Sequence, residues 1–308
     1  MSSLNSAIKL LKIIRLHIVV GGFMAFSLGA LLGIAGGGSF DPWLFVLVYV
    51  IVFLGDLSTH FSNDYFDVEV DRHIDRRKFF AGSTILVSNP HLRSSSKSVS
   101  VALLLSSNLL AVGLVLFVGA PIEVFVVILG ASLAGWFYSA PPLRLISRGL
   151  GELTVAGVTG FAIPGLGYLV MRGWFDPLFC CFAVPFVMYG FMLSLSLEAP
   201  DVEVDRKGGK RTFAVRKGQR HVFLLVLGLA VSATLAFFAY RWLVAPTIVD
   251  LGVVTLFSMA PLIASLVGFV GVFQKRGVDH FSSLNVASLF AFNMLMLAYL
   301  AFLLIGKL

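Results

Sequence analysis

The chain has 308 residues, of which 58% are hydrophobic and only 13% are charged, and its mean hydropathy is +0.95. This composition excludes a soluble globular domain, which needs a polar surface to face water. The formal net charge of +7 does not indicate a nucleic-acid partner, because the basic residues fall between apolar segments. We therefore expect an integral, multi-pass membrane protein whose surroundings are the lipid bilayer, with no nucleic-acid partner.

Nine apolar segments are long enough to cross a bilayer as helices, each of which needs roughly 20 residues. The first is long for a signal peptide and is followed by further spans, so we interpret it as a retained helix. The expected limits are about 14–36, 43–63, 98–119, 122–139, 151–172, 177–199, 221–241, 247–272 and 282–306. The sequence thus predicts an all-α protein with a single multi-span membrane domain over residues 1–308.

The positions of Lys and Arg predict the orientation of these spans, because short cytoplasmic loops are enriched in both residues. With a cytoplasmic N-terminus, all but Arg172, Arg241 and Lys307 of the 23 basic residues face the cytoplasm. Three loops, at about 63–97, 139–150 and 199–220, then share that side of the membrane. In a prokaryote this membrane would be the cell membrane.

One acidic segment occurs twice, at the end of the second span and at the end of the sixth. Residues 67–72 read Asp-Val-Glu-Val-Asp-Arg, and residues 201–206 are identical. An exact repeat at equivalent places predicts two pseudo-symmetric four-helix halves plus a ninth helix.

Helical spacing predicts which side chains of the two segments share a face. Residues three or four positions apart lie on one side of a helix, whereas residues two apart do not, so Glu69 and Glu203 should point away. The residues expected to share a face are Asn63, Asp64, Asp67 and Asp71 in the first segment and Glu198, Asp201 and Asp205 in the second.

Two such clusters of like charge on one membrane face require cations between them. Oxygen ligands without nearby Cys or His favour Mg²⁺ over zinc and predict a metal–diphosphate site. The alternative is that the acids are solvated loop residues paired with neighbouring arginines. The exact repeat favours the metal site.

These segments resemble the motifs of the UbiA superfamily of intramembrane prenyltransferases. Residues 63–71 fit its NDxxDxxxD motif, and residues 201–205 with Gly-Lys-Arg-Thr at 209–212 resemble its second aspartate motif. Residues 138–145, Tyr-Ser-Ala-Pro-Pro-Leu-Arg-Leu, resemble its third conserved loop, and Gly-Leu-Gly-Glu-Leu at 149–153 is most similar to the menaquinone-forming branch. The resemblance spans most of the chain and implies nine helices with both motifs facing the cytoplasm.

The resemblance implies transfer of a prenyl group from an isoprenyl diphosphate to a lipophilic, aromatic acceptor in quinone or lipid biosynthesis, with release of pyrophosphate. Mg²⁺, or Mn²⁺ in its place, would neutralise the leaving group. The implied metal ligands are Asn63, Asp64, Asp67, Asp71, Asp201 and Asp205. The implied catalytic residues are Asp67, Asp71, Asp201, Asp205 and Tyr138.

Further residues near the motifs are candidates for binding the diphosphate oxygens. They are Asn63, Arg72, Arg144, Arg206 and Lys210. For the four cations, the alternative is that they only orient the protein in the membrane. Tyr138 at the end of the fourth span either anchors at the membrane interface or faces a carbocation.

Asp56 and His60 precede Asn63 at helical spacing inside the second span. Ionisable residues are costly inside a membrane and mark functional sites by default. Either residue is a candidate for accepting a proton or for orienting the acceptor, and a purely structural Asp–His pair is the alternative.

A secondary transporter is the main alternative function, because repeated halves and intramembrane acids also mark transporters. Coupling residues of transporters lie near the bilayer midplane, whereas here most carboxylates follow the ends of spans. A lipid phosphatidyltransferase is disfavoured because its glycine-alanine-arginine signature between aspartates is absent.

Overall fold

The computed structural model describes residues 3–73, 83–243 and 248–305, and helices form nearly all of these. Nine helical segments in this part of the chain are long and apolar enough to span a membrane, which confirms the predicted number of spans. The spans are formed by α2 (Leu16–Ala35), α3 (Pro42–Phe66), α6 (Arg93–Gly113) with η2 (Leu114–Val118), α7 (Ile122–Ser139), α8 (Gly151–Gly157) with η4 (Val158–Ala162) and α9 (Ile163–Arg172), α10 (Pro177–Glu198), α13 (Gln219–Leu243), α14 (Leu251–Phe257) with α15 (Met259–Phe273), and α16 (Val278–Leu303).

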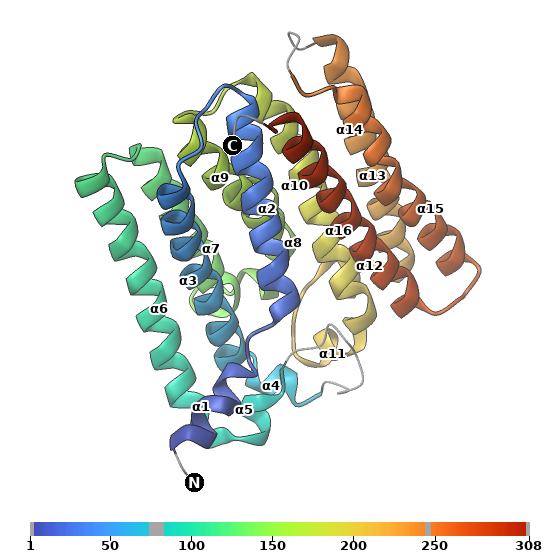
Figure 1. The fold of residues 1–308 in the computed structure, drawn as a ribbon. Helices are drawn as coiled ribbons and strands as arrows, with labels where there is room; N and C mark the ends of the chain where they lie inside the picture. The colour runs from blue at the N-terminus through green and yellow to red at the C-terminus, as the bar shows by residue number, and fades with distance from the viewer. Residues whose placement is uncertain (1–2, 74–82, 244–247, 306–308) are drawn as a thin grey trace.

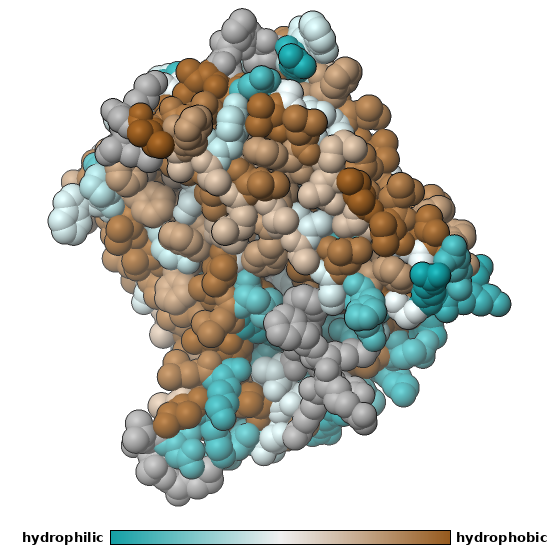
Figure 2. Space-filling view, turned by 45° about the vertical axis from the view of Figure 1, so that its right-hand side comes forward, coloured by the Kyte–Doolittle hydropathy of each residue, from teal (hydrophilic) through white to brown (hydrophobic). Residues whose placement is uncertain are grey.

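Shorter helices lie before and between the spans. They are α1 (Ser3–Leu11), α4 (Val68–Asp71), α5 (Ile85–Ser88), η1 (Pro90–Leu92), η3 (Leu145–Arg148), η5 (Ala199–Asp201), α11 (Val202–Lys207) and α12 (Phe213–Lys217). Figure 1 shows α1, α4, α5 and α11 gathered at one end of the bundle, the end that carries the N-terminus. In Figure 2 hydrophilic side chains collect at this end, and hydrophobic side chains cover the flanks of the spans. This surface is that of an integral, multi-pass membrane protein.

Two helical pairs carry the repeated acidic segments. In one pair α3 packs along α6, and in the other α10 packs along α13. The repeat follows the first helix of each pair, as α4 after α3 and as α11 after α10, and α4 contacts α11. The two copies of the repeat therefore lie on the same side of the protein. The full pseudo-symmetry of the two halves stays a prediction.

The third span begins earlier than predicted. We expected its start near residue 98, but helical structure begins at Pro90. The added turns and the first turn of the predicted span carry serines whose hydroxyl groups donate to backbone oxygens of α3. Ser96 Oγ donates to Phe61 O over 3.0 Å, and Ser100 Oγ donates to the Ser58 carbonyl over 2.8 Å. Hydropathy alone does not detect a polar turn whose hydroxyls are satisfied by a neighbouring helix.

The sixth span also extends beyond its predicted end at 199, because η5 and α11 continue the helical path to Lys207. Some predicted features lie outside the described residues: the start of the eighth span at 247, the end of the ninth at 306, and the basic residues Arg76, Arg77, Lys78 and Lys307. The cytoplasmic location of the N-terminus stays a prediction.

α2 and α9 pack closely against each other. Gly29 on α2 lies so near α9 that a Cβ atom would be 1.8 Å from Pro164 O. Only glycine fits this position, as in other membrane helix pairs whose backbones touch. α16 packs on α2 as well and helps to close the bundle.

Candidate active site

Lys210 joins the two copies of the acidic repeat. Its ammonium nitrogen lies 3.2 Å from Asp67 Oδ2 and 3.6 Å from Asp205 Oδ1, and its side chain is largely buried. The loop after α11 holds Lys210 in place, since its backbone N–H donates to Asp205 O over 2.9 Å. One cation thus contacts a carboxylate from each repeat, so the two repeats face a common site.

Both repeats begin with the same local backbone geometry. Asp67 has φ −95° and ψ 9°, and Asp201 has φ −101° and ψ 13°, so a slight break separates each span from the short helix that follows. Helical hydrogen bonds continue through the first break, because the Asp71 N–H donates to Asp67 O over 2.8 Å. Asp71 and Asp205 are buried behind these breaks. Asp71 and Asp205 thus point into the protein, as the helical spacing predicted for them.

The glutamates of the repeats point to the outside, which confirms that prediction. Glu69 and Glu203 are 65% and 74% exposed, and they pair with Arg72 and Arg206 over 2.8 and 2.9 Å. These two arginines were candidates for binding diphosphate. The structure places them on the exposed surface with their glutamates and does not bring them to the carboxylate site.

Arg15 is a member of the site that the sequence reasoning counted only as an orienting cation. It precedes the first turn of α2, and its Nη2 lies 3.0 Å from Asp64 Oδ1. The Ser83 hydroxyl donates to the other oxygen of Asp64. Asp64 therefore has partners on both oxygens, whereas Asp67 shares Lys210 with Asp205.

The site concentrates negative charge. Burial and the neighbouring carboxylates of Asp64 and Asp67 raise the pKa of Asp71 to about 7. Burial lowers the pKa of Lys210, but the carboxylates of Asp67 and Asp205 outweigh it and the net shift is upward. No three His, Cys, Asp or Glu side chains of the described residues converge closely enough to bind a metal ion alone. The arrangement fits a divalent cation that takes its remaining ligands from a bound phosphate group.

A cavity of about 370 Å³ lies within the bundle between α2, α3, α7, α8, α9, α10 and α16, and it reaches Asn63, four residues before Asp67. Polar side chains from the sequence predictions line it, namely Asp56, His60, Asn63 and Tyr138, together with Arg15 and His17. Phe186, Phe290 and Phe292 contribute to its apolar wall. The cavity therefore has polar side chains on the part of α3 that leads to the first acidic repeat, and an apolar wall that suits a hydrocarbon chain.

The model of the UbiA prenyltransferase family matches residues 23–292, which is most of the chain. The protein belongs to the UbiA prenyltransferase family. This membership confirms the resemblance found in the motifs and supports an enzyme that transfers alkyl groups over a transporter.

Relatives of this UbiA family member include digeranylgeranylglyceryl phosphate synthase of Metallosphaera sedula. The two are 30% identical over 194 residues, which is 61% of this chain and 59% of the relative. The chain thus aligns with about three fifths of that curated relative.

Solved structures of UbiA homologues share the fold. A homologue from Archaeoglobus fulgidus bound to DMAPP and Mg²⁺ superposes with a TM-score of 0.66 at 16% identity, covering 94% of this chain and 99% of that one. The apo homologue from Aeropyrum pernix K1 gives 0.66 at 13% identity, covering 92% and 98%. These matches confirm the predicted all-helical membrane fold.

Two buried glutamates of this UbiA family member lie close to the site. Glu198 Oε1 accepts a hydrogen bond from Ser194 Oγ over 2.9 Å, and Glu152 accepts one from the backbone N–H of Phe213. Glu152 was not a predicted site residue. Its sequence signals are its place in the Gly-Leu-Gly-Glu-Leu segment at 149–153 and at the start of an apolar span. Its hydrogen bond ties the beginning of α8 to the first residue of α12.

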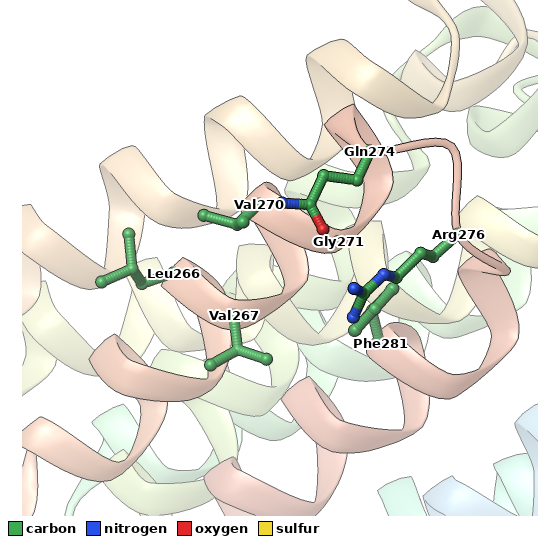
Figure 3. A pocket seen from close by; sticks show the side chains of 7 residues that line it. All are labelled: Leu266, Val267, Val270, Gly271, Gln274, Arg276 and Phe281. Atoms are coloured by element: carbon green, nitrogen blue, oxygen red, sulfur yellow. The ribbon is translucent and has the colours of Figure 1, made fainter.

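Two further features of the described residues are Arg144 and a second pocket. Arg144 is exposed, with φ +43°, and among the described residues it forms no ion pair with the site. The second pocket, about 320 Å³, lies along α15 and includes Arg276 and Phe281 (Figure 3). Since no carboxylate lines this pocket, the acidic repeats and the cavity beside them form the candidate active site.

Proposed function

We propose that the protein transfers a prenyl group from an isoprenyl diphosphate to a lipophilic acceptor with the help of Mg²⁺. The observation that carries this proposal is the contact of Lys210 with both Asp67 and Asp205. Because the ammonium group of Lys210 lies between carboxylates of the two repeats, this is a position at which the protein stabilises positive charge. Homologues from Archaeoglobus fulgidus bind DMAPP or GPP together with Mg²⁺, which supports the same ligands here.

The acidic repeats, together with Asn63 on the cavity wall, fit a metal–diphosphate complex. Asp67, Asp71, Asp201 and Asp205 would hold Mg²⁺, with Asn63 and Asp64 beside them. Bound Mg²⁺ would neutralise charge on the leaving pyrophosphate. Lys210 would donate hydrogen bonds to phosphate oxygens, which are stronger partners for an ammonium group than neutral acceptors are. Asn63 lines the cavity and its Oδ1 has no partner within the described residues, so it is available to a ligand.

The apolar part of the cavity would hold the hydrocarbon chain of the donor. Phe186, Phe290 and Phe292 line it and exclude water, which would otherwise capture the prenyl cation. Tyr138 lies on the cavity wall at the end of α7, where its ring is available to face that cation.

Two classes of acceptor are candidates. The motif resemblance favours an aromatic acceptor of quinone biosynthesis. The relative from Metallosphaera sedula is named a digeranylgeranylglyceryl phosphate synthase, which supports a glycerol-phosphate lipid as the second class.

The test uses the purified protein in nanodiscs with radiolabelled isoprenyl diphosphates of several chain lengths. Mg²⁺ or Mn²⁺ should support pyrophosphate release and formation of a prenylated product, and EDTA should abolish both. Naphthoate, hydroxybenzoate, homogentisate, haem and glycerol-phosphate lipids serve as the acceptor panel. Uptake of a solute into vesicles without pyrophosphate production from any donor would overturn the proposal and favour a transporter.

A further inference from the structure

The cavity contains an ionisable pair that the metal–diphosphate site does not use. Asp56 and His60 lie one turn apart on α3 and both line the cavity with Asn63. From the proposed function, on which this inference rests, we infer that Asp56 binds a phenolic hydroxyl group of an aromatic acceptor and that His60 holds Asp56 in position.

Hydrogen bonding fixes the role of His60. The backbone N–H of Arg15 donates to His60 Nδ1 over 3.4 Å, so Nδ1 acts as an acceptor and a neutral ring carries its hydrogen on Nε2. Nε2 lies 3.6 Å from Asp56 Oδ1 and has no hydrogen-bond partner among the described residues. The imidazole therefore directs its N–H toward Asp56. The one ring lone pair, on Nδ1, already accepts the hydrogen bond from the Arg15 N–H. His60 is a positioning residue.

Asp56 has the accessibility that His60 lacks. The Asp56 side chain is 23% exposed where it lines the cavity, and the His60 side chain is 4% exposed. The nearest guanidinium group, that of Arg15, is bound to Asp64 at 3.0 Å. Asp56 Oδ2 has no hydrogen-bond partner in the part of the chain that the structure describes. A carboxyl oxygen left unpaired in an apolar cavity is costly, so a ligand that donates a hydrogen bond gains affinity there.

Position along α3 specifies which group of the acceptor reaches Asp56. Asp56, Asn63 and Asp67 are seven and eleven residues apart, which places them on one face of a continuous helix. The helical rise separates Asp56 from Asn63 by roughly 10 Å. This distance is close to the length of a path that starts at a diphosphate oxygen, passes through the first prenyl carbon and crosses one aromatic ring to the hydroxyl group on its far side. The hydroxyl at Asp56 is thus remote from the ring carbon that receives the prenyl group.

The carboxylate also selects against other acceptors. An anionic carboxylate or phosphate at this depth would face the charge of Asp56, so the deep end of the acceptor is a neutral hydroxyl group. A site built to hydrogen-bond a hydroxyl rejects the analogue without it by roughly 10⁴-fold, whereas an apolar site discriminates weakly.

The experiment compares a hydroxynaphthoate acceptor with its methyl ether in wild-type protein, Asp56→Asn, His60→Gln and His60→Ala. Glu123→Gln, an equivalent change at an exposed acid, is the control. Wild type and the control should prefer the hydroxyl compound in kcat/KM by at least roughly 100-fold. Asp56→Asn should lose most of this preference through a higher KM for the acceptor. His60→Gln retains an N–H donor and should lose less than His60→Ala.

Acceptor-independent pyrophosphate release separates this inference from the proposed function. Without an acceptor, water that enters the empty acceptor space takes the prenyl cation, and the products are pyrophosphate and a prenyl alcohol. Asp56→Asn should release pyrophosphate in this reaction at the wild-type rate within about twofold, since the diphosphate lies at the acidic repeats. Unchanged discrimination in Asp56→Asn, or a parallel loss of donor ionisation, would overturn the inference while the proposed function stands. Absence of pyrophosphate release from wild-type protein would instead refute the proposed function.

Discussion

Lys210 lies 3.2 Å from Asp67, although four membrane spans, from α6 to α10, separate the two residues along the chain. The same ammonium group is 3.6 Å from Asp205 on the second repeat. The contact identifies a position at which positive charge is stabilised by both halves of the sequence. When a diphosphate binds with its metal ions, these ions must replace Lys210 as the partner of the two carboxylates. The ammonium group of Lys210 is then free to bind phosphate oxygens.

Lys210→Met should reduce kcat/KM for the isoprenyl diphosphate by roughly 10- to 100-fold, since it removes a positioned cation from developing negative charge. Steady-state pyrophosphate release over a range of donor concentrations measures this effect. Lys217→Met on the exposed end of α12 is the matched control and should retain wild-type kinetics. Equal losses in the two variants would show that general loop charge, and not the contact with both repeats, matters.

Substitutions within the repeats should separate the acids assigned to the site from the exposed ones. Asp67→Asn and Asp201→Asn should each lower turnover by at least roughly 100-fold, because each removes a charged group from the site. Glu69→Gln and Glu203→Gln should change turnover by less than about threefold, because these glutamates are exposed and paired with arginines. Similar losses at all four positions would contradict the assignment of inner and outer faces.

The repeats and the spans could be predicted from the sequence because their signals are local. Hydropathy marks the spans, and an exact six-residue repeat marks two ends that face the same side. Helical spacing also predicted that Glu69 and Glu203 point outward, since that depends only on the geometry of one helix.

The contacts between separate helices could not be predicted from the sequence. Arg15 is indistinguishable from an orienting cation until the start of α2 is placed against Asp64 on α3. Glu152 reaches the backbone of Phe213 across 61 residues, and no spacing rule connects them. The phenylalanines of the cavity wall are likewise selected only by packing, since apolar residues are common along every span.

Binding of Mg²⁺ should weaken as the pH falls through about 7. The pKa of Asp71 is raised to about 7 by burial and by the carboxylates of Asp64 and Asp67, so this group gains a proton over that range. A protonated carboxyl is a poor metal ligand, so one pH unit below 7 should weaken affinity by up to roughly tenfold relative to one unit above. Calorimetric titration with Mg²⁺ of protein that holds a non-cleavable diphosphate analogue measures this affinity. Affinity that stays constant across the range would contradict a role of Asp71 in metal binding.

Removal of the Tyr168 hydroxyl should destabilise the protein without affecting its chemistry. Tyr168 is buried on α9, and its hydroxyl donates to Asp176 Oδ1 over 2.6 Å at the start of α10, away from the acidic repeats. Burial raises the pKa of Asp176, but hydrogen bonds from Tyr168, the Phe179 N–H and Arg172 outweigh it, and the net shift is downward. The stabilisation is therefore present above the ordinary carboxyl pKa and is lost as pH falls.

Tyr168→Phe should lower the free energy of unfolding at neutral pH by about 2 kcal/mol, the usual contribution of a hydrogen bond to a charged group. The difference in melting temperature between the variant and wild type should shrink in acid, as Asp176 becomes protonated in both. Tyr240→Phe on α13, whose hydroxyl is not part of this network, is the control. A loss of kcat/KM in folded Tyr168→Phe protein would show instead that this network acts on the active site, because stability alone leaves the kinetics of the folded fraction unchanged.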